Sequence, residues 1–485
     1  MSGTIAVIGA GASGLATARQ LQLAGLPFEV LEQTGDIGGN WRLAADNEHA
    51  GVFASTHANT SRQIMAFSEH DMPDGLPTYP HHSQLLAYLR SYAGRFGLVE
   101  HVRTGHPVQA ATPVDGGRGG WDVIVGGGAP VRYRALCVAS GHHWAARVPA
   151  LAGEFGGTSL HAKAYRTRSG FAGKRVLLVG LGASGADIAV DLSHVARSVD
   201  VSVRRGYHIV PKIVMGRPLD HFAFERKKSL LPPGVRRKLT DKLLGTLIGD
   251  PTPFGFPRPT HGLRDVSPTI SQELLGRIAQ GSVVIRPDVD VLEGDRVRFA
   301  DGTGDRYDVL IYATGYDIAC PFLPPDVLPT GTPFAMYRHV VHPVAENLFF
   351  IGFVQPLGGF WPVSEAQAQW VAAMLRGTVP RPGAEWMRAA IDAAWSAFRA
   401  EGRGSHDTFI QVEQDLYLLD LWREMVPAGT RRRARQRLRD RLALAEHPLC
   451  LAQLADDLLG SVPASLHALE SSLPMIVGEK YSHKH

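Results

Sequence analysis

Cysteine is scarce in this sequence of 485 residues, and its three cysteines, Cys137, Cys320 and Cys450, lie far apart. An odd and scattered set cannot form a disulfide framework, and it lacks the C-x-x-C spacing of a zinc site. We therefore expect no metal site. We also expect a chain that keeps its thiols reduced, as in the cytoplasm.

Long apolar runs are also missing, because no stretch of about 18 apolar residues occurs and no segment is expected to span a membrane. The first residues enter an apolar strand at once, without the basic and apolar stretches of a secretory signal. Charge is nearly balanced, with 50 basic and 46 acidic residues and a formal net charge of +4. This balance gives no indication of nucleic-acid binding. The length and a hydrophobic fraction of 45% indicate a globular chain of two or three domains.

The N-terminal stretch "IAVIGAGASGLATA" predicts a strand, a glycine loop and a helix. Residues 5–8 are apolar throughout, which is typical of a buried parallel strand. A helix is predicted over residues 12–23, and "PFEVLE" is predicted to be the next strand. The loop carries the motif GxGxxG, and its position between a strand and a helix makes the motif specific for dinucleotide binding. Its glycines are Gly9, Gly11 and Gly14.

Each residue of this motif has a physical role. Gly9 permits the tight turn, Gly11 lets a pyrophosphate approach the backbone, and Gly14 lets the helix pack closely on the strand. The N-terminus of the helix offers free N–H groups and the positive end of its dipole to the phosphates. Glu32, at the end of the second strand, can accept hydrogen bonds from both ribose hydroxyls and would repel a 2′-phosphate. This loop is therefore expected to hold FAD or NAD and not NADP.

The stretch "VLLVGLGASGADIAV", residues 176–190, repeats the pattern with Gly180, Gly182 and Gly185. The strand that follows it is predicted at residues 199–203 and leads into two arginines, Arg204 and Arg205. Glu32 lies 18 residues after Gly14, and Arg204 lies 19 residues after Gly185. A guanidinium there suits the 2′-phosphate of NADPH, although exposed arginines after a strand are the alternative. Two such loops in one chain favour a bound FAD that is reduced by NADPH.

Two other regions have distinct compositions. Residues 215–270 are rich in Pro, Phe, Lys and Arg and are predicted to form a helical insertion with an irregular loop. Helical segments dominate from residue 364 onward. Residues 430–445 form a basic stretch, for which a solvated helix face and the binding of an acidic partner or a membrane surface both remain open.

The segment "FGGTSLHAKAY", residues 155–165, fits the fingerprint FxGxxxHxxx(Y/F). On this motif the chain resembles the flavin-containing monooxygenases, a group of class B flavoprotein monooxygenases, and the resemblance covers most of residues 3–380. The related Baeyer–Villiger monooxygenases end a similar fingerprint in Trp-Pro. This chain has Tyr165 and Arg166 there, which favours the flavin-containing group. His161 has no second ligand at a suitable spacing and is interpreted as a structural or hinge residue.

Further segments carry the resemblance. "GGNW", residues 38–41, resembles the stretch that lies along FAD, and residues 58–73 resemble the stretch that carries the active-site asparagine of the family, here Asn59. "IYATGY" at 311–316 and the segment around Gln355 resemble the parts that close the nucleotide folds. The resemblance implies Asn59 as the catalytic residue. The cofactor-binding residues expected from the two loops and from these segments are Gly9, Gly11, Ser13, Gly14, Glu32, Gln33, Gly39, Asn40, Trp41, Thr60, Gln355, Gly180, Gly182, Ser184, Gly185, Arg204 and Arg205.

The expected fold is α/β, with two Rossmann-like domains of the glutathione-reductase type. The NADP-binding domain is inserted in the FAD-binding domain, and a helical extension follows at the C-terminus. The expected boundaries are 1–160 for the first part of the FAD domain, 161–308 for the NADP domain, 309–380 for the return segment and 381–485 for the extension.

The resemblance implies a reaction in which NADPH reduces FAD and the reduced flavin forms a C4a-hydroperoxide with dioxygen. That species oxygenates a soft nitrogen or sulfur nucleophile of a small molecule. A Baeyer–Villiger monooxygenase acting on ketones and a non-oxygenating FAD/NADP-binding protein remain as alternatives. A flavin disulfide reductase would need a cysteine pair that the sequence lacks. Oligomeric state stays open, with a homodimer among the options.

Overall fold

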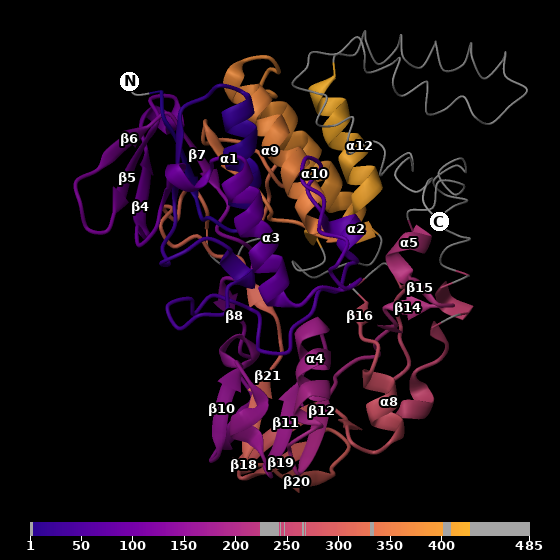
Figure 1. Cartoon of the computed structure of the whole chain (residues 1–485). Coiled ribbons are helices and arrows are strands. Elements are labelled where there is room, and N and C mark those ends of the chain that lie inside the picture. The colour runs from indigo at the N-terminus through magenta and orange to yellow at the C-terminus, as the bar shows by residue number, and fades with distance from the viewer. Residues whose placement is uncertain are drawn as a thin grey trace, which may run out of the picture.

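The computed structural model of the chain describes residues 3–223, 248–263, 268–329, 334–400 and 409–426, together with residues 242, 244–246 and 266. The basic stretch 430–445 and Cys450 lie outside the described residues, as does much of the predicted insertion 215–270. The described chain forms two α/β units, which Figure 1 shows one above the other.

The upper unit in Figure 1 is built on a parallel sheet of five strands in the order β23-β7-β1-β2-β3. The central strands are fully or largely buried, which explains their apolar sequences without alternation. The bounds of the strands are β1 Ile5–Ile8, β2 Phe28–Leu31, β3 Val102–Arg103, β7 Ala135–Val138 and β23 Leu348–Phe350.

The lower unit repeats this plan with a parallel sheet in the order β10-β21-β11-β12-β17. Its strands are β10 Thr158–His161, β11 Arg175–Val179, β12 Ser198–Ser202, β17 Val284–Arg286 and β21 Val309–Tyr312. The chain returns to the upper sheet at β23, so the lower unit is inserted in the upper one, and the predicted fold class is confirmed.

Strand pairing divides the chain differently from the expected boundaries at 160 and 308. β10 precedes the first boundary almost entirely and β21 follows the second, yet both pair within the lower sheet. β9 (Ala152–Phe155) also pairs with β18 (Val289–Gly294) of that unit. A division by sheets would therefore place residues 152–312 in the lower unit. The sequence motifs mark the glycine loops and cannot show which neighbours flank them.

Each parallel sheet lies between helices on one face and a smaller sheet on the other. In the upper unit, α1 (Ala12–Leu23), α3 (His82–Arg95) and α9 (Phe360–Arg376) cover one face. The opposite face packs on an antiparallel sheet formed by β4 (Val108–Pro113), β5 (Trp121–Val125) and β6 (Val131–Tyr133). Successive residues of β1 alternate between these two cores, because neighbouring side chains of a strand point to opposite faces.

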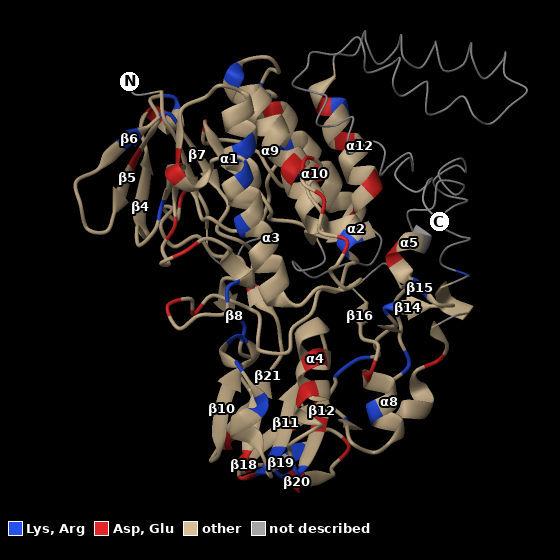
Figure 2. Ribbon diagram, viewed as in Figure 1, with Lys and Arg blue, Asp and Glu red and all other residues tan. Residues whose placement is uncertain are grey.

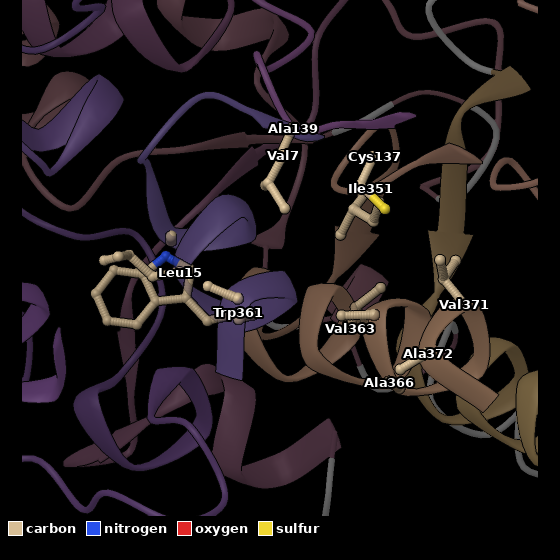
Figure 3. Close-up of a cluster of buried hydrophobic side chains, with 14 of the residues drawn as sticks. Val7, Leu15, Cys137, Ala139, Ile351, Trp361, Val363, Ala366, Val371 and Ala372 are labelled. Atoms are coloured by element: carbon tan, nitrogen blue, oxygen red, sulfur yellow. The ribbon is translucent and has the colours of Figure 1, made fainter. Parts of the chain in front are cut away.

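Figure 3 shows the helical side of the upper core. Val7 of β1, Leu15 of α1 and Trp361 of α9 are each no more than 1% exposed. Ser13 in α1 lies with its Oγ 3.0 Å from the Oγ of Ser364 in α9, which ties the two helices together beside the first glycine loop. α9 ends where Gly377 adopts a left-handed φ of +82°.

In the lower unit, α4 (Ala183–Leu192) and α8 (Leu274–Ala279) cover one face of the sheet. A small sheet in the order β20-β19-β18-β9 covers the other face. β19 spans Arg296–Phe299 and β20 spans Gly304–Arg306, and the turn between them contains Asp301 and Gly302.

The described part of residues 215–270 is only partly helical. It contains β15 (Arg217–Pro218), α5 (Leu219–Ala223) and β16 (Thr269–Ile270). β15 pairs with β14 (Ile213–Val214), so the insertion begins with a short hairpin that the sequence analysis did not predict.

The described C-terminal region is helical, as expected, with α10 (Ala384–Ala400) and α12 (Gln414–Met425) following α9. Figure 2 shows basic and acidic residues interspersed over both units. Among the described residues, no helix combines the length and the apolar composition needed to cross a bilayer.

Candidate active site

The first glycine loop joins β1 to α1, and close backbone contacts require two of its glycines. Gly9 has a φ of +102°, and a Cβ on it would lie 2.8 Å from the carbonyl oxygen of Ala139. A Cβ on Gly14 would lie 1.8 Å from the carbonyl oxygen of Gly9, so α1 can pack on the loop only without a side chain there. At Gly11 the nearest atom to a Cβ would be the Cα of Gly39 at 3.5 Å, an ordinary contact. The fold itself therefore does not require glycine at residue 11, whereas the approach of a ligand would.

The N-terminus of α1 is available to an anion. Gly11 is its N-cap residue, and no side chain caps the first turn. Gly11, Ala12 and Ser13 line a cavity of about 350 Å³. Uncapped N–H groups and the positive end of the helix dipole at a cavity suit a pyrophosphate.

Glu32 lines this cavity and is held by hydrogen bonds from backbone and side-chain donors. It is 5% exposed; its Oε2 accepts from the backbone N of Ala10 at 2.7 Å. Its Oε1 accepts from the backbone N of Thr34 at 2.9 Å and from the hydroxyl of Thr34 at 2.8 Å. The neighbouring Gln33 is exposed and also lines the cavity. These three bonds leave the fixed carboxylate one of its roughly four lone-pair positions, which can accept from a ribose hydroxyl.

Aromatic side chains also line the cavity. The rings of Trp41 and Trp361 meet edge to face with their centroids 6.3 Å apart. Gly39 and Asn40 also line the cavity, and the Oδ1 of Asn40 accepts from the backbone N of Gly51 at 2.6 Å. The cavity wall thus contains a carboxylate, an uncapped helix end and aromatic rings, a combination that suits a dinucleotide with an aromatic ring system.

Three further expected site residues do not line this cavity: Asn59, Thr60 and Gln355. The hydroxyl of Thr60 donates to the carbonyl of Gly358 at 3.2 Å, which joins this segment to the return segment. Gln355 is exposed in β24 (Gln355–Leu357), which pairs with β25 (Gln411–Glu413). The Oδ1 of Asn59 is buried and has no hydrogen-bond partner among the described residues. A buried amide oxygen without a partner suits a position where a ligand supplies the donor.

The second glycine loop joins β11 to α4 and repeats the geometry of the first. Gly180 has a φ of +93°, and a Cβ on it would lie 2.8 Å from the carbonyl oxygen of Ala313. A Cβ on Gly185 would lie 2.7 Å from the carbonyl oxygen of Gly180. Gly182 is the uncapped N-cap of α4; it is exposed, and a Cβ on it would meet no atom within 4 Å. Ser184, in the first turn, is half-buried. This helix end is open to a second anionic ligand.

The strand register shows that Arg204 is not the residue equivalent to Glu32, because it lies one residue beyond the equivalent position. Leu31 pairs with Ile8 before the first loop, and Ser202 pairs with Val179 before the second. The residue equivalent to Glu32 is therefore Val203, which is 2% exposed. Arg204 is the next residue along the chain. The lower unit thus lacks a carboxylate at this position, and its exposed guanidinium is displaced by one residue.

Arg205 is exposed, and its guanidinium lies 5.9 Å from the ring centroid of Tyr207. Arg204 is also exposed directly after β12. Both side chains are accessible to a phosphate at this edge of the lower sheet, where the open N-terminus of α4 also lies.

The fingerprint residues pack within the lower unit and against the residues that directly follow β21. A Cβ on Gly157 would lie 2.6 Å from the carbonyl oxygen of Asp308. The Nε2 of His161 lies 3.1 Å from the carbonyl of Gly315, and burial lowers the pKa of His161. The hydroxyl of Tyr165 donates to Asp191 of α4 at 2.7 Å. These contacts support the structural interpretation of His161.

Sequence reasoning missed part of the cavity wall. His142, His143 and Trp144 line the cavity directly after β7, and Phe360 lines it at the start of α9. The ring of Trp144 stacks on His49 with the centroids 3.9 Å apart. The position of His142, His143 and Trp144 could have been predicted from the sequence. Residues that follow a parallel strand lie at the same sheet edge as the glycine loop of a neighbouring strand.

The described residues contain no group of His, Cys, Asp or Glu side chains that could hold a metal ion. Cys137 and Cys320 are buried, and neither is in a disulfide. Two Rossmann-like units, one inserted in the other, each with a glycine loop that leads into an uncapped helix, define a two-dinucleotide oxidoreductase fold. The geometry fits FAD and a nicotinamide dinucleotide, and the comparisons with known proteins agree.

The family model "flavin-binding monooxygenase-like" matches residues 2–426. The chain belongs to this family; it is a monooxygenase, and its cofactors are FAD and NADPH. It is similar to flavin-containing monooxygenase 5 of Oryctolagus cuniculus, with 34% identity over 80% of this chain and 76% of the relative. It is also 31% identical to dimethylaniline monooxygenase [N-oxide-forming] 2 of Oryctolagus cuniculus, over 81% of this chain and 76% of the relative.

Solved structures with the same fold include two that act on different substrates. S-allyl-L-cysteine S-oxygenase from Allium sativum matches with a TM-score of 0.66 at 21% identity, over 98% of both chains. An open structure of cyclohexanone monooxygenase matches with a TM-score of 0.63 at 18% identity, over 84% of this chain and 96% of that one. At these identities the likeness concerns the fold and not the substrate.

Proposed function

We propose that the protein transfers one oxygen atom from dioxygen to a nucleophilic nitrogen or sulfur of a small molecule. In the balanced reaction, the substrate, O2, NADPH and a proton give the oxygenated substrate, NADP+ and water. The observation that carries the assignment of the two cofactors is the pair of uncapped helix ends. One has a rigid carboxylate beside it, at Glu32, and the other has an exposed guanidinium, at Arg204.

We assign FAD to the first loop and NADPH to the second. FAD supplies the oxygen-transfer chemistry when it is bound. The N-terminus of α1 would bind its pyrophosphate and Glu32 its adenosine ribose. The N-terminus of α4 would bind the pyrophosphate of NADPH, and Arg204 and Arg205 would pair with its 2′-phosphate. The absence of a carboxylate at Val203 removes the repulsion that Glu32 would exert on that phosphate.

The other residues exclude water and hold hydrogen bonds. The rings of Trp41, Phe360 and Trp361, which line the cavity, would keep water from the oxygen-transferring edge of the flavin, which prevents release of hydrogen peroxide. The side-chain amide of Asn59 can donate one hydrogen bond and accept another. Its buried and unpartnered Oδ1 supports a role in orienting a bound group. We assign Asn59 as the catalytic residue of the oxygenation step.

Oxygenation of nitrogen or sulfur is favoured over insertion next to a ketone by the end of the fingerprint. Tyr165 is held by Asp191, and the backbone carbonyl of the following Arg166 accepts from the backbone N of Ala54 at 2.8 Å. A Trp-Pro pair could not reproduce the hydrogen bond of the tyrosine hydroxyl. The N-oxide-forming relative, dimethylaniline monooxygenase 2, points in the same direction. We further propose that the protein works in the cytoplasm, where buried thiols such as Cys137 remain reduced.

The test supplies the purified holoenzyme with NADPH, 18O2 and one substrate at a time: a tertiary amine, a dialkyl sulfide or a cyclic ketone. An N-oxide or sulfoxide with one 18O atom, formed in proportion to the NADPH consumed, is the expected result. An ester or lactone as the main product would establish the Baeyer–Villiger alternative. NADPH consumption without any oxygenated product would favour the non-oxygenating alternative.

A further inference from the structure

The segment that carries Asn59 belongs to the upper unit, yet side chains of the inserted lower unit hold it. Residues 58–61 precede α2 (Arg62–Met65). Figure 1 shows α5 of the insertion beside α2, and hydrogen bonds join the two segments.

The contacts flank Asn59 on both sides. On its N-terminal side, the Nζ of Lys212 donates to the carbonyl of Ala58 at 3.1 Å. On its C-terminal side, the Oδ2 of Asp220 accepts from the backbone N of Ser61 at 2.6 Å. The Nε2 of His221 lies 3.2 Å from the hydroxyl of Ser61, which is fully buried. Side chains of the lower unit thus hold the backbone on both sides of Asn59.

Burial of the Asp220 carboxylate at this position lowers the stability of the fold. Its Oδ1 is buried and has no hydrogen-bond partner among the described residues, so half of the carboxylate loses its water without compensation. The Oδ1 of Asn59 is in the same condition. These two buried oxygens both lack donors, and residues 59–61 together with the hydrogen bond from the Ser61 amide to Asp220 link them. Stability alone does not explain such a pair.

Lys212 is itself fixed from the upper unit. Its backbone carbonyl accepts from the hydroxyl of Tyr79 at 2.6 Å, and its Nζ lies 5.5 Å from the centroid of the Tyr79 ring. Burial lowers the pKa of Lys212, and the charge of Asp187 in α4 opposes this shift. Lys212, which holds residue 58, therefore also interacts electrostatically with α4, the helix that follows the second glycine loop.

We propose that Asp220 is a positioning residue for Asn59: its carboxylate holds the amide of Ser61 and so fixes the Asn59 side chain in the site. This inference rests on the proposed role of Asn59. Asp220 does not contact the reacting atoms, and its effect on Asn59 is transmitted through the backbone of residues 59–61. The insertion thereby supplies the hydrogen-bond acceptor that positions Asn59 of the upper unit for coupled oxygenation.

The first measurement is independent of turnover. Hydrogen exchange followed by mass spectrometry on peptides that cover residues 58–66 is compared between the wild type and Asp220→Ala. The Ser61 amide is expected to exchange at least about tenfold faster in the variant, because it loses a charge-assisted hydrogen bond. Asp220→Asn keeps an acceptor oxygen and is expected to restore most of the protection. Asp250→Ala is the matched control, because Asp250 accepts from the backbone N of Thr252 at 3.0 Å within the same insertion.

The second measurement is the ratio of oxygenated product to NADPH consumed, together with flavin content and melting temperature. Asp220→Ala is expected to lower coupled turnover about 10- to 100-fold, since a small displacement of a positioned group has effects of this size. Asp220→Asn and Asp250→Ala are expected to remain close to the wild type. In an Asn59→Leu background, Asp220→Ala is expected to add no further loss.

The outcomes separate this inference from the proposed function. Full coupling in Asn59→Leu would overturn the assignment of Asn59, and this inference with it. Uncoupling in Asn59→Leu together with full coupling in Asp220→Ala would overturn this inference alone. An unchanged exchange rate of the Ser61 amide in Asp220→Ala would also overturn this inference alone. Loss of flavin in both Asp220→Ala and Asp220→Asn would show that Asp220 only stabilises the fold, and would also refute the inference.

Discussion

Glu365 in α9 is expected to make the stability of the upper unit depend on pH near neutrality. The side chain is 3% exposed and accepts hydrogen bonds from the backbone N of Ser68 at 3.0 Å and from the hydroxyl of Ser68 at 2.9 Å. Burial raises the pKa of Glu365 from 4.5 to about 7, and the two bonds from Ser68 only partly oppose this shift.

The sign of the effect follows from proton binding. Between pH 4.5 and 7 the folded protein holds a proton on Glu365 that the unfolded chain has lost. The free energy of unfolding therefore decreases as the pH rises through this window. At about 1.4 kcal/mol for each pKa unit, the whole effect is about 3.5 kcal/mol, of which about 2.5 kcal/mol falls between pH 5 and pH 8.

The perturbation is Glu365→Gln, which keeps the shape and an acceptor oxygen but removes the titration. Urea unfolding of the flavin-loaded protein is measured at pH 5 and at pH 8 for the variant and the wild type. The variant is expected to gain about 2.5 kcal/mol relative to the wild type on going from pH 5 to pH 8. Glu100→Gln, which makes the same change on an exposed side chain, is expected to show no such gain. A constant difference for Glu365→Gln, or one of opposite sign, would refute the reasoning.

Three further variants test the assigned cofactor sites. Asn59→Leu is expected to retain FAD but to divert NADPH consumption to hydrogen peroxide, with oxygenated product reduced on the order of 10²–10³; wild-type coupling measured by peroxide assay would contradict this. Arg204→Ala is expected to raise the KM for NADPH about ten- to a hundredfold and to leave the KM for NADH nearly unchanged; equal effects on both coenzymes would place the arginine elsewhere. Gly14→Ala is expected to abolish the yellow colour of bound flavin, because its Cβ would lie 1.8 Å from the carbonyl oxygen of Gly9. Gly94→Ala, whose Cβ would meet nothing within 4 Å, is the control and is expected to bind flavin normally.

The sequence determined the local units well. The predicted strand at residues 5–8 and the predicted helix at 12–23 have the same bounds in the structure. Strand, glycine loop and helix follow one another within one stretch of chain, so apolar patterning and the glycine spacing are sufficient to recognise them. The paired glycine loops, the scarcity of cysteine and the fingerprint together indicated the family, which the comparisons confirmed.

Tertiary structure decided what depends on neighbours distant in sequence. Strand register placed Val203, and not Arg204, at the position of Glu32, because hydrogen bonding between strands and not residue counting sets equivalence. Pairing also assigned β10 and β21 to the lower sheet.

The walls of the site were decided in the same way. Trp144, which follows β7, and Trp361 in α9 reach one cavity because parallel strands end at a common edge and α9 packs on α1. The sequence also placed Asn59 and Asp220 in different domains. Only the folded chain brings the carboxylate of Asp220 to the backbone beside Asn59, since no local pattern records a contact between residues so far apart in sequence.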